Sequence, residues 1–89
     1  MVIWKFQLSI IDVQKVMMPI GAQILTVQTQ FGKPQLWALC DPDEKIGQES
    51  RIFAIYGTGN PIDENPGKYI STFQVYDGKG VFHVFELKQ

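Results

Sequence analysis

The sequence predicts an all-β fold, a small antiparallel β-sandwich or partly open barrel of about six strands. Two observations lead to this prediction. Short runs of residues alternate apolar and polar side chains, or are apolar throughout, as strands do. Between the runs lie breaks rich in glycine and proline, at residues 31–34, 57–61 and 77–80. With 89 residues, the chain is predicted to form a single domain over residues 1–89.

The first half of the chain contains four candidate strands. Residues 2–10 form the clearest one, because five apolar side chains occupy every second position. A short strand follows and ends at Pro19, which has no N–H to donate to a ladder. Residues 22–31 and 35–40 are predicted to pair as an antiparallel hairpin, with the turn at Gly32-Lys33-Pro34.

The second half contains three candidate strands, at residues 51–56, 69–76 and 81–87. The polar segment 41–49 predicts a loop with one helical turn, capped by Asp41. Gly57 to Gly67 forms a long loop, and loops of this length are disproportionately functional. The pair Asp77-Gly78 predicts a hairpin turn between the last two strands. All seven runs together would exceed the usual strand content, so one of them is expected to fail.

Large apolar side chains on these runs form the predicted core. Each lies on a run that is apolar or alternating, so each is expected to be largely buried. The predicted core residues are Trp4, Phe6, Trp37, Leu39, Phe53, Ile55, Phe73 and Phe85.

The charges of the chain are balanced and scattered. Eight Lys and Arg against nine Asp and Glu give a net charge of −1, and the basic residues stand singly. Tight nucleic-acid binding and a polybasic membrane patch both need clustered basic residues, so neither partner is expected. No apolar run approaches a membrane span, and the N-terminus has no signal-peptide pattern. We expect an intracellular, cytoplasmic protein.

Cys40 is the single cysteine, so it has no partner for an internal disulfide. It ends the apolar run 36–40, and the acidic residues that follow would oppose formation of a thiolate. Cys40 is therefore predicted to be a small buried apolar residue and not a nucleophile.

The sequence predicts no metal and no cofactor. Asp41, Asp43 and Glu44 resemble the opening of a calcium loop, but the glycine and the final glutamate of that loop are missing. His83 is the only histidine, and one histidine cannot form a zinc site by itself. Two interpretations of His83 stay open: a hydrogen-bonded structural histidine, or a general base with a partner from the long loop.

The start of the long loop is the best candidate binding site. Gly57 and Gly59 flank Thr58, and consecutive N–H groups in such a turn can point at one anion. The alternative interpretation is a turn that requires glycine at positive φ. Asn60 adds a donor and an acceptor. The aromatic residues Tyr56 and Tyr69 flank the loop and offer contact area.

Five motifs spread over nearly the whole chain resemble a family of small uncharacterised proteins encoded largely by phages and prophages. Members of that family often carry histidine at the position of Asn60, which lowers the expectation of a catalytic or metal role for this loop. The resemblance implies a phage-associated accessory protein in the cytoplasm of the host cell, and implies no reaction. The motifs are Trp4-Lys5-Phe6, Met18-Pro19-x-Gly21-Ala22, Leu36-Trp37-Ala38-Leu39, Ile55-Tyr56-Gly57-Thr58-Gly59-x-Pro61-Ile62 and Phe82-His83-Val84-Phe85-Glu86.

These observations predict a non-enzymatic binding module, because no recognisable catalytic constellation is present. Its target would be a protein or a small anionic ligand held at the loop of Gly57, Thr58, Gly59 and Asn60. Two alternatives are a single-stranded nucleic-acid binder of the OB type and, less expected, a small hydrolytic enzyme that uses His83. A homodimer through an edge strand or an exposed aromatic face is also considered, because small β-domains must cover their edges.

Overall fold

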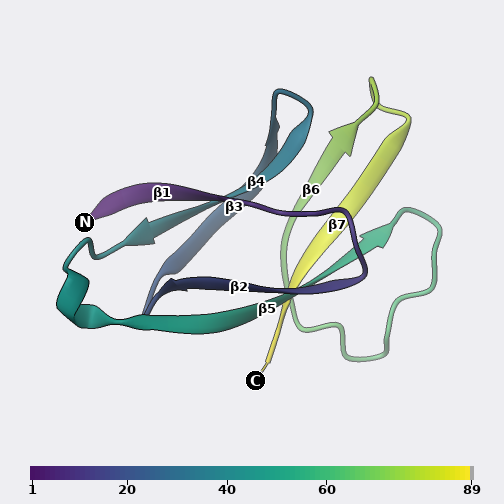
Figure 1. Cartoon of the computed structure of the whole chain (residues 1–89). Coiled ribbons are helices and arrows are strands. Elements are labelled where there is room, and N and C mark those ends of the chain that lie inside the picture. Colours follow the sequence, from purple (N-terminus) through teal and green to yellow (C-terminus); the bar gives the residue numbers. More distant parts are fainter. Residues whose placement is uncertain (89) are drawn as a thin grey trace.

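The computed structural model describes residues 1–88, which form seven strands and one short 3-10 helix (Figure 1). All strand pairs are antiparallel, so the predicted fold class is confirmed, and all seven candidate strands form. The expectation that one run would fail was wrong. The elements are β1 (Val2–Gln7), β2 (Val13–Pro19), β3 (Gln23–Gln30), β4 (Lys33–Cys40), η1 (Glu44–Ile46), β5 (Gln48–Gly57), β6 (Lys68–Val75) and β7 (Gly80–Leu87).

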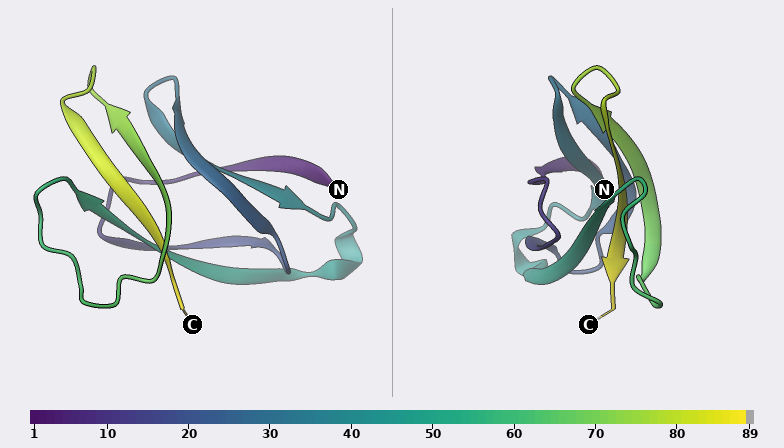
Figure 2. Two further views of the ribbon diagram at one scale, coloured as in Figure 1. Left: turned by 180° about the vertical axis from the view of Figure 1, so that it is seen from behind. Right: turned by 90° about the vertical axis from the view of Figure 1, so that its right-hand side faces the viewer.

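The strands form two sheets that do not close into a barrel. One sheet has three strands in the order β1-β4-β3, and the other has four in the order β2-β5-β7-β6. Consecutive strands β1 and β2 therefore lie in different sheets, and the chain crosses between them at residues 8–12 (Figure 2). The side-chain amide of Gln14 fixes this corner, because it accepts from Ser9 N and donates to Ser9 O at 3.0 and 2.7 Å.

On the opposite side, a polar seam joins the free edges of β3 and β6. The Ser71 hydroxyl is buried and donates to the carbonyl of Val27 at 2.8 Å. It lies 3.1 Å from the Thr26 hydroxyl and accepts from Gln28 Nε2 at 3.3 Å. Both strands carry a register shift at this place, after Ile24 in β3 and after Tyr69 in β6. Such bulges twist an edge strand and end regular pairing, so side chains make the joint here.

A bidentate ion pair closes the lower end of the sandwich. Arg51 on β5 donates through Nη2 to Glu86 Oε1 of β7 at 2.9 Å, and its Nε contacts the second carboxylate oxygen. Arg51 Nη1 donates to the carbonyl of Ala22 at 2.8 Å. Because Ala22 precedes β3, one half-buried guanidinium connects both sheets.

The core agrees only partly with the sequence prediction. Phe53, Ile55 and Phe73 are buried, whereas Phe6, Trp37, Leu39 and Phe85 are partly exposed. The prediction for Trp4 was wrong: its side chain is 42% exposed. Trp4 faces inward, but β1 is an edge strand with a neighbour on one side, so its ring lacks cover on the other.

Several predicted boundaries shift for local reasons. The β3–β4 turn is Phe31-Gly32, because a two-residue turn of this kind needs positive φ at both positions, and φ is 52° and 75°. Lys33 and Pro34, predicted as turn residues, start β4. The short helix is capped by Asp43 and not by Asp41, since the Asp43 carboxylate accepts from Lys45 N.

The contacts of Ser71 in the seam are expected to contribute to the free energy of unfolding. The Ser71→Ala substitution removes the donor to the buried Val27 carbonyl and should lower the free energy of unfolding by about 1–3 kcal/mol. Urea unfolding followed by far-UV circular dichroism measures this. The exposed Ser9, whose hydroxyl has no hydrogen bond among the described residues, serves as a control: Ser9→Ala should change stability by less than about 0.5 kcal/mol. Equal effects would contradict the role of the seam.

Candidate functional site

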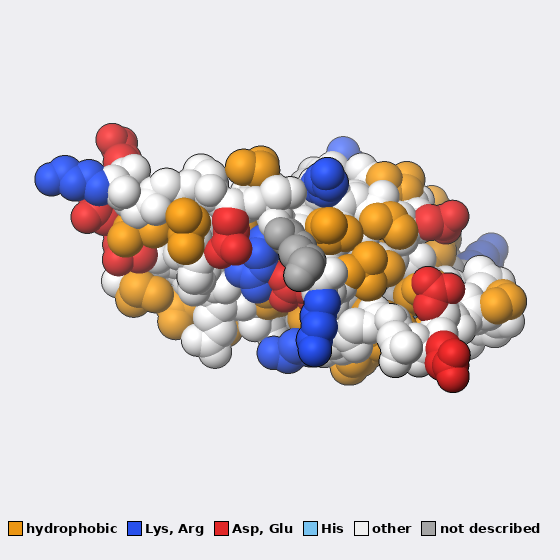
Figure 3. All heavy atoms as spheres, turned by 90° about the horizontal axis from the view of Figure 1, so that it is seen from below, with side chains coloured by type: hydrophobic (Ala, Val, Ile, Leu, Met, Phe, Trp, Pro, Cys, Tyr) orange, Lys and Arg blue, Asp and Glu red, His pale blue; other side chains and the backbone are white. Residues whose placement is uncertain are grey.

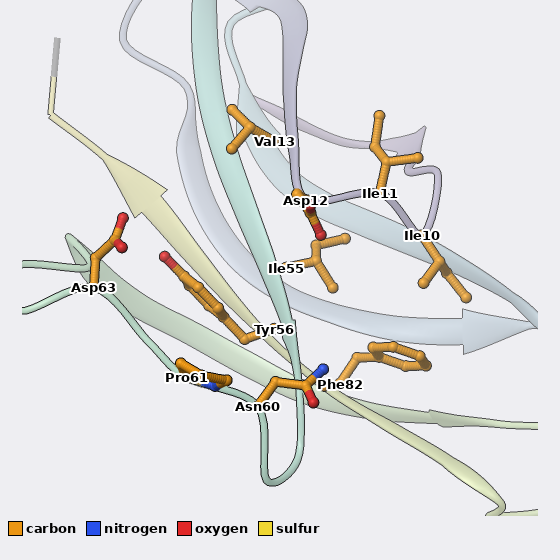
Figure 4. A pocket seen from close by; sticks show the side chains of 11 residues that line it. Ile10, Ile11, Asp12, Val13, Ile55, Tyr56, Asn60, Pro61, Asp63 and Phe82 are labelled. Carbon is orange, nitrogen blue, oxygen red and sulfur yellow. The ribbon is translucent and has the colours of Figure 1, made fainter.

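A cavity of 410 Å³ lies between the β1–β2 corner, the end of β5 and the beginning of the long loop (Figure 4). The corner contributes residues 10–13, β5 contributes residues 55–57, and the loop contributes Asn60, Pro61 and Asp63. Phe82 of β7 completes the lining. Three of the predicted binding residues, Tyr56, Gly57 and Asn60, therefore meet at one site.

The cavity exists because β5 continues past the beginning of β2. The last residue pair between these strands is Val13 with Ala54, after which Ile55 N donates to Asp12 O at 3.0 Å. Backbone groups alternate in direction along a strand, so the N–H of Gly57 points to the same edge as that of Ile55. The residues before Asp12 lead away to β1 and do not pair with β5. The end of β5, residues 55–57, therefore faces the cavity.

The polar groups of the cavity are acidic or neutral. Asp12 and Asp63 supply two carboxylates, Tyr56 supplies a hydroxyl and Asn60 an amide, while none of the lining residues is Lys or Arg. Figure 4 shows the Tyr56 ring with its hydroxyl toward the side of Asp63, and Asn60 beside Phe82. Apolar side chains form the rest of the lining. Such a site suits a positively charged or hydrogen-bond-donating group on an apolar stem.

Gly57 is in close contact with the Asn60 side chain, and Gly59 has a backbone angle that favours glycine. A Cβ at position 57 would lie 2.9 Å from Asn60 Nδ2, so the glycine lets the amide pack against the strand. Gly59 has φ of 88°, a left-handed conformation that favours glycine. Asn60 N donates to Gly57 O at 3.1 Å and closes the turn.

The predicted anion nest does not form at this turn. Thr58 N already donates to Val81 O at 3.0 Å, and Asn60 N donates to Gly57 O. A nest needs consecutive N–H groups that are free to converge on one ligand. Here Thr58 N and Asn60 N stabilise the turn, so no two consecutive N–H groups from Gly57 to Asn60 are free to converge on one ligand.

Thr58 instead belongs to a row of hydroxyl groups around His83. Thr58 Oγ1 lies 2.7 Å from His83 Nε2, and Thr72 Oγ1 lies 2.9 Å from His83 Nδ1. The Tyr69 hydroxyl lies 2.7 Å from Thr72 Oγ1. The row connects β6, β7 and the long loop across the outer face of the four-stranded sheet. Both ring nitrogens of His83 are thus used, Nε2 in holding the start of the loop and Nδ1 in contacting β6.

The contact between Thr58 and His83 has the length of the hydrogen bond between nucleophile and base in a hydrolase. The groups around the two side chains differ from those of a catalytic triad. In a triad the second histidine nitrogen faces a carboxylate, whereas His83 Nδ1 faces the Thr72 hydroxyl. Thr58 Oγ1 also donates to Val81 O at 3.3 Å, which directs its proton to the backbone. The cavity described above includes neither Thr58 nor His83.

Tyr69 lies outside the cavity, on the outer face of the sheet. Its ring packs edge-to-face on Phe85, with centroids 5.6 Å apart, and Tyr56 packs on Phe85 in the same way at 5.8 Å. The two tyrosines predicted to flank one binding loop are therefore connected through Phe85, and only Tyr56 reaches the cavity.

Cys40 is fully buried on β4. Burial raises the pKa of its thiol, and a backbone hydrogen bond at Trp4 opposes this in part. A raised pKa leaves the thiol protonated at neutral pH, which fits the predicted apolar role.

The acidic cluster after β4 is used in local turns. Asp41 accepts from Asp43 N at 3.0 Å, and Asp43 accepts from Lys45 N at 2.9 Å. Among residues 1–88, no three His, Cys, Asp or Glu side chains gather in metal-binding geometry. Figure 3, a view from below, shows acidic and basic side chains of both signs scattered among apolar ones.

A family model described as a domain of unknown function, DUF7352, matches residues 1–89. The chain belongs to the DUF7352 family. No curated protein and no solved structure matches it. In the part of the chain that the structure describes, no helix is long and apolar enough to cross a bilayer.

For this DUF7352 member, sequence reasoning missed the corner residues of the site. Asp12 lies in the crossing between β1 and β2, and nothing in the sequence places that crossing beside the long loop. Asp63 lies within the loop predicted to be functional, but the sequence does not show that its carboxylate lines the same cavity as Tyr56. Phe82 alternates with His83 and Val84 on a strand, and only the strand order shows which face meets the cavity.

The buried thiol can be tested with a thiol reagent. At pH 8, Cys40 should react with Ellman's reagent at least about a hundredfold more slowly in the folded protein than in urea, because it is buried and protonated. The absorbance of the released thiolate measures both rates. Comparable rates would show that β4 is accessible.

The hydroxyl row can be tested by Thr58→Val, which keeps the branched shape and removes the hydroxyl. It should lower the free energy of unfolding by about 0.5–1.5 kcal/mol, since the contact to His83 is lost. Thr29→Val is the matched control, because Thr29 is exposed and its hydroxyl has no hydrogen bond among residues 1–88. Urea unfolding compares the two. If Thr58→Val leaves stability unchanged, the row does not hold the loop.

Proposed function

We propose that this protein is a non-enzymatic binding module that holds a positively charged group in the cavity at the end of β5. The observation that carries the proposal is the lining: two carboxylates, of Asp12 and Asp63, without any lysine or arginine. A lysine or arginine side chain of a partner protein, or a small amine, has the matching chemistry. The ligand class thus differs from the anionic ligand expected at the glycine turn.

The shape of the site supports a cation carried on an apolar stem. Ile10, Ile55 and Phe82 can cover three or four methylene groups, while Asp12 and Asp63 neutralise the charged head. The N–H of Gly57 and the amide of Asn60 add directional polar contacts. Each carboxylate at such an exposed site contributes about 0.2–1 kcal/mol, so an isolated amine should bind weakly. A partner protein would add contact area around the cavity.

Two observations favour binding over catalysis. Thr58 and His83 lie outside the cavity. The residue at His83 Nδ1 is Thr72, where a catalytic triad has a carboxylate.

The carboxylates of the cavity would repel a nucleic-acid phosphate, which weighs against the alternative of a single-stranded nucleic-acid binder. The resemblance of five sequence motifs to small phage and prophage proteins is the reason to propose a phage-associated accessory role.

The proposal predicts a preference for positive charge among ligands of equal size. Propylguanidinium and propylammonium should shift the amide resonances of Tyr56, Gly57 and Asn60 in a titration of ¹⁵N-labelled protein. Butyrate, which has a similar stem and opposite charge, should not. Asp63→Asn should weaken propylguanidinium binding about two- to fivefold, as should Asp12→Asn.

Glu64 gives the matched control, because it is an exposed acidic neighbour of Asp63 that does not line the cavity. Glu64→Gln should leave the affinity within about 1.5-fold of the unmodified protein. Equal binding of butyrate, or an equal loss in Asp63→Asn and Glu64→Gln, would refute a cation site.

A further inference from the structure

Four strands of the two sheets have a side without a ladder partner, and three of them are protected. β3 and β6 carry bulges and cover each other through the Ser71 seam. β2 ends at Pro19, which lacks an N–H, and carries the exposed Lys15 near its middle. β1 has no proline and no bulge, and all six of its residues pair in unbroken register with β4.

The backbone groups on the free side of β1 can be assigned from the ladder. Leu8 N donates to Pro34 O of β4 at 3.0 Å, so even-numbered residues direct their backbone groups to β4. Ile3, Lys5 and Gln7 therefore direct theirs outward. These three residues are also exposed. An unprotected row of donors and acceptors of this kind pairs readily with another strand.

The one charge on β1 does not guard this edge. Lys5 Nζ donates to Gln30 Oε1 on β3, and it lies 5.9 Å from the centre of the Trp37 ring on β4. The lysine is thus folded back over its own sheet, away from the free side of β1. An edge lysine discourages pairing when it projects into the place of the next strand, which Lys5 does not.

Large apolar side chains are exposed along the first half of the edge. Met1 is 72% exposed, Ile3 58% and Trp4 42%. Trp4 faces inward, toward Ala38 and Leu36 of β4, yet its ring remains uncovered on the free side of the strand. A further strand at this edge would cover the ring.

We propose that β1 pairs antiparallel with β1 of a second copy, about a two-fold axis at Trp4. The same surface then serves both copies, as a two-fold interface requires. Trp4 faces Trp4 of the second copy, and Val2 faces Phe6, so the inward side is apolar throughout. On the outer side Ile3 faces the aliphatic stem of Lys5. The two three-stranded sheets join into one sheet of six strands, 3 + 3.

Other registers fit the edge less well. Hydrogen bonding requires outward residues to face outward residues, so the axis can move only by whole residues along the strand. An axis at Lys5 would place two lysines directly opposite, which is destabilising. An axis at Ile3 would pair only residues 2–4 within the strand and would shorten the overlap. The axis at Trp4 gives the longest overlap within β1 without placing two lysines opposite each other.

The strand is short, so the dimer should be weak. An edge of this size buries less than a standard interface of about 1,600 Å². In sedimentation velocity between about 10 μM and 1 mM, the full chain should pass from monomer to dimer. Ile3→Pro removes one outward N–H and leaves the ladder to β4 intact, and it should weaken association at least about tenfold.

A control variant keeps this test independent of folding. Ile3→Lys leaves the backbone unchanged and places lysine opposite Lys5 of the second copy, so it should also weaken association at least about tenfold. Ile62→Lys adds the same charge at an exposed apolar residue of the long loop and should leave association unchanged. A chain that stays monomeric at 1 mM would overturn the proposal, as would equal effects of Ile3→Lys and Ile62→Lys.

The register can be read from disulfide trapping in a Cys40→Ala background. With the axis at Trp4, mild oxidation should link two copies of the Trp4→Cys variant, because opposite residues of a non-hydrogen-bonded pair have Cβ atoms about 4.5–5.5 Å apart. Ile3→Cys and Lys5→Cys should each link much more slowly alone. Faster trapping of either one than of Trp4→Cys would place the axis elsewhere and overturn the register.

Discussion

The Ser71 hydroxyl joins two sheets that otherwise share no backbone ladder along that side. It donates to Val27 O across the seam between β6 and β3, and its other contacts are with Thr26 and Gln28 of β3. The cavity depends on the placement of the four-stranded sheet relative to the three-stranded one, because residues 10–12 of the crossing between the sheets line it. Arg51 supports the same arrangement from the lower end, since its guanidinium bridges Glu86 and the carbonyl of Ala22. Side chains thus fix the geometry that backbone pairing leaves open.

The cavity follows from a difference in strand length. β5 has ten residues and β2 has seven, and the corner that leads into β2 cannot cover the end of β5. The long loop returns over this uncovered edge, and Asn60 packs on Gly57 because the glycine has no side chain. The two acidic residues of the cavity come from different segments: Asp12 belongs to the corner and Asp63 to the loop. A site built in this way is held by the fold and does not require the loop to be rigid along its whole length.

Alternation was sufficient to predict the strands, because a strand with one buried face must place an apolar residue at every second position. It could not predict the exposure of Trp4, since the alternating pattern is the same for an edge strand and a central one. The long loop was predicted from Gly57 to Gly67 and lies between β5 and β6, and Tyr56, Gly57 and Asn60 meet at the cavity. Asp12 could not be connected to them, because that requires knowing that β2 pairs with β5. The contacts of His83 were equally hidden, as they join residues of three separate segments.

The strand order also determines when each part of the molecule can form during synthesis. The hairpins β3–β4 and β6–β7 pair neighbours in the chain and close small loops. β1 must wait for β4, and β2 for β5, so these two strands have no ladder partner until residues 40 and 54 have left the ribosome. Closing such loops costs entropy before any contact is gained. β1 and β2 are therefore made well before the strands that shelter them, and their apolar edges stay unpaired for that interval.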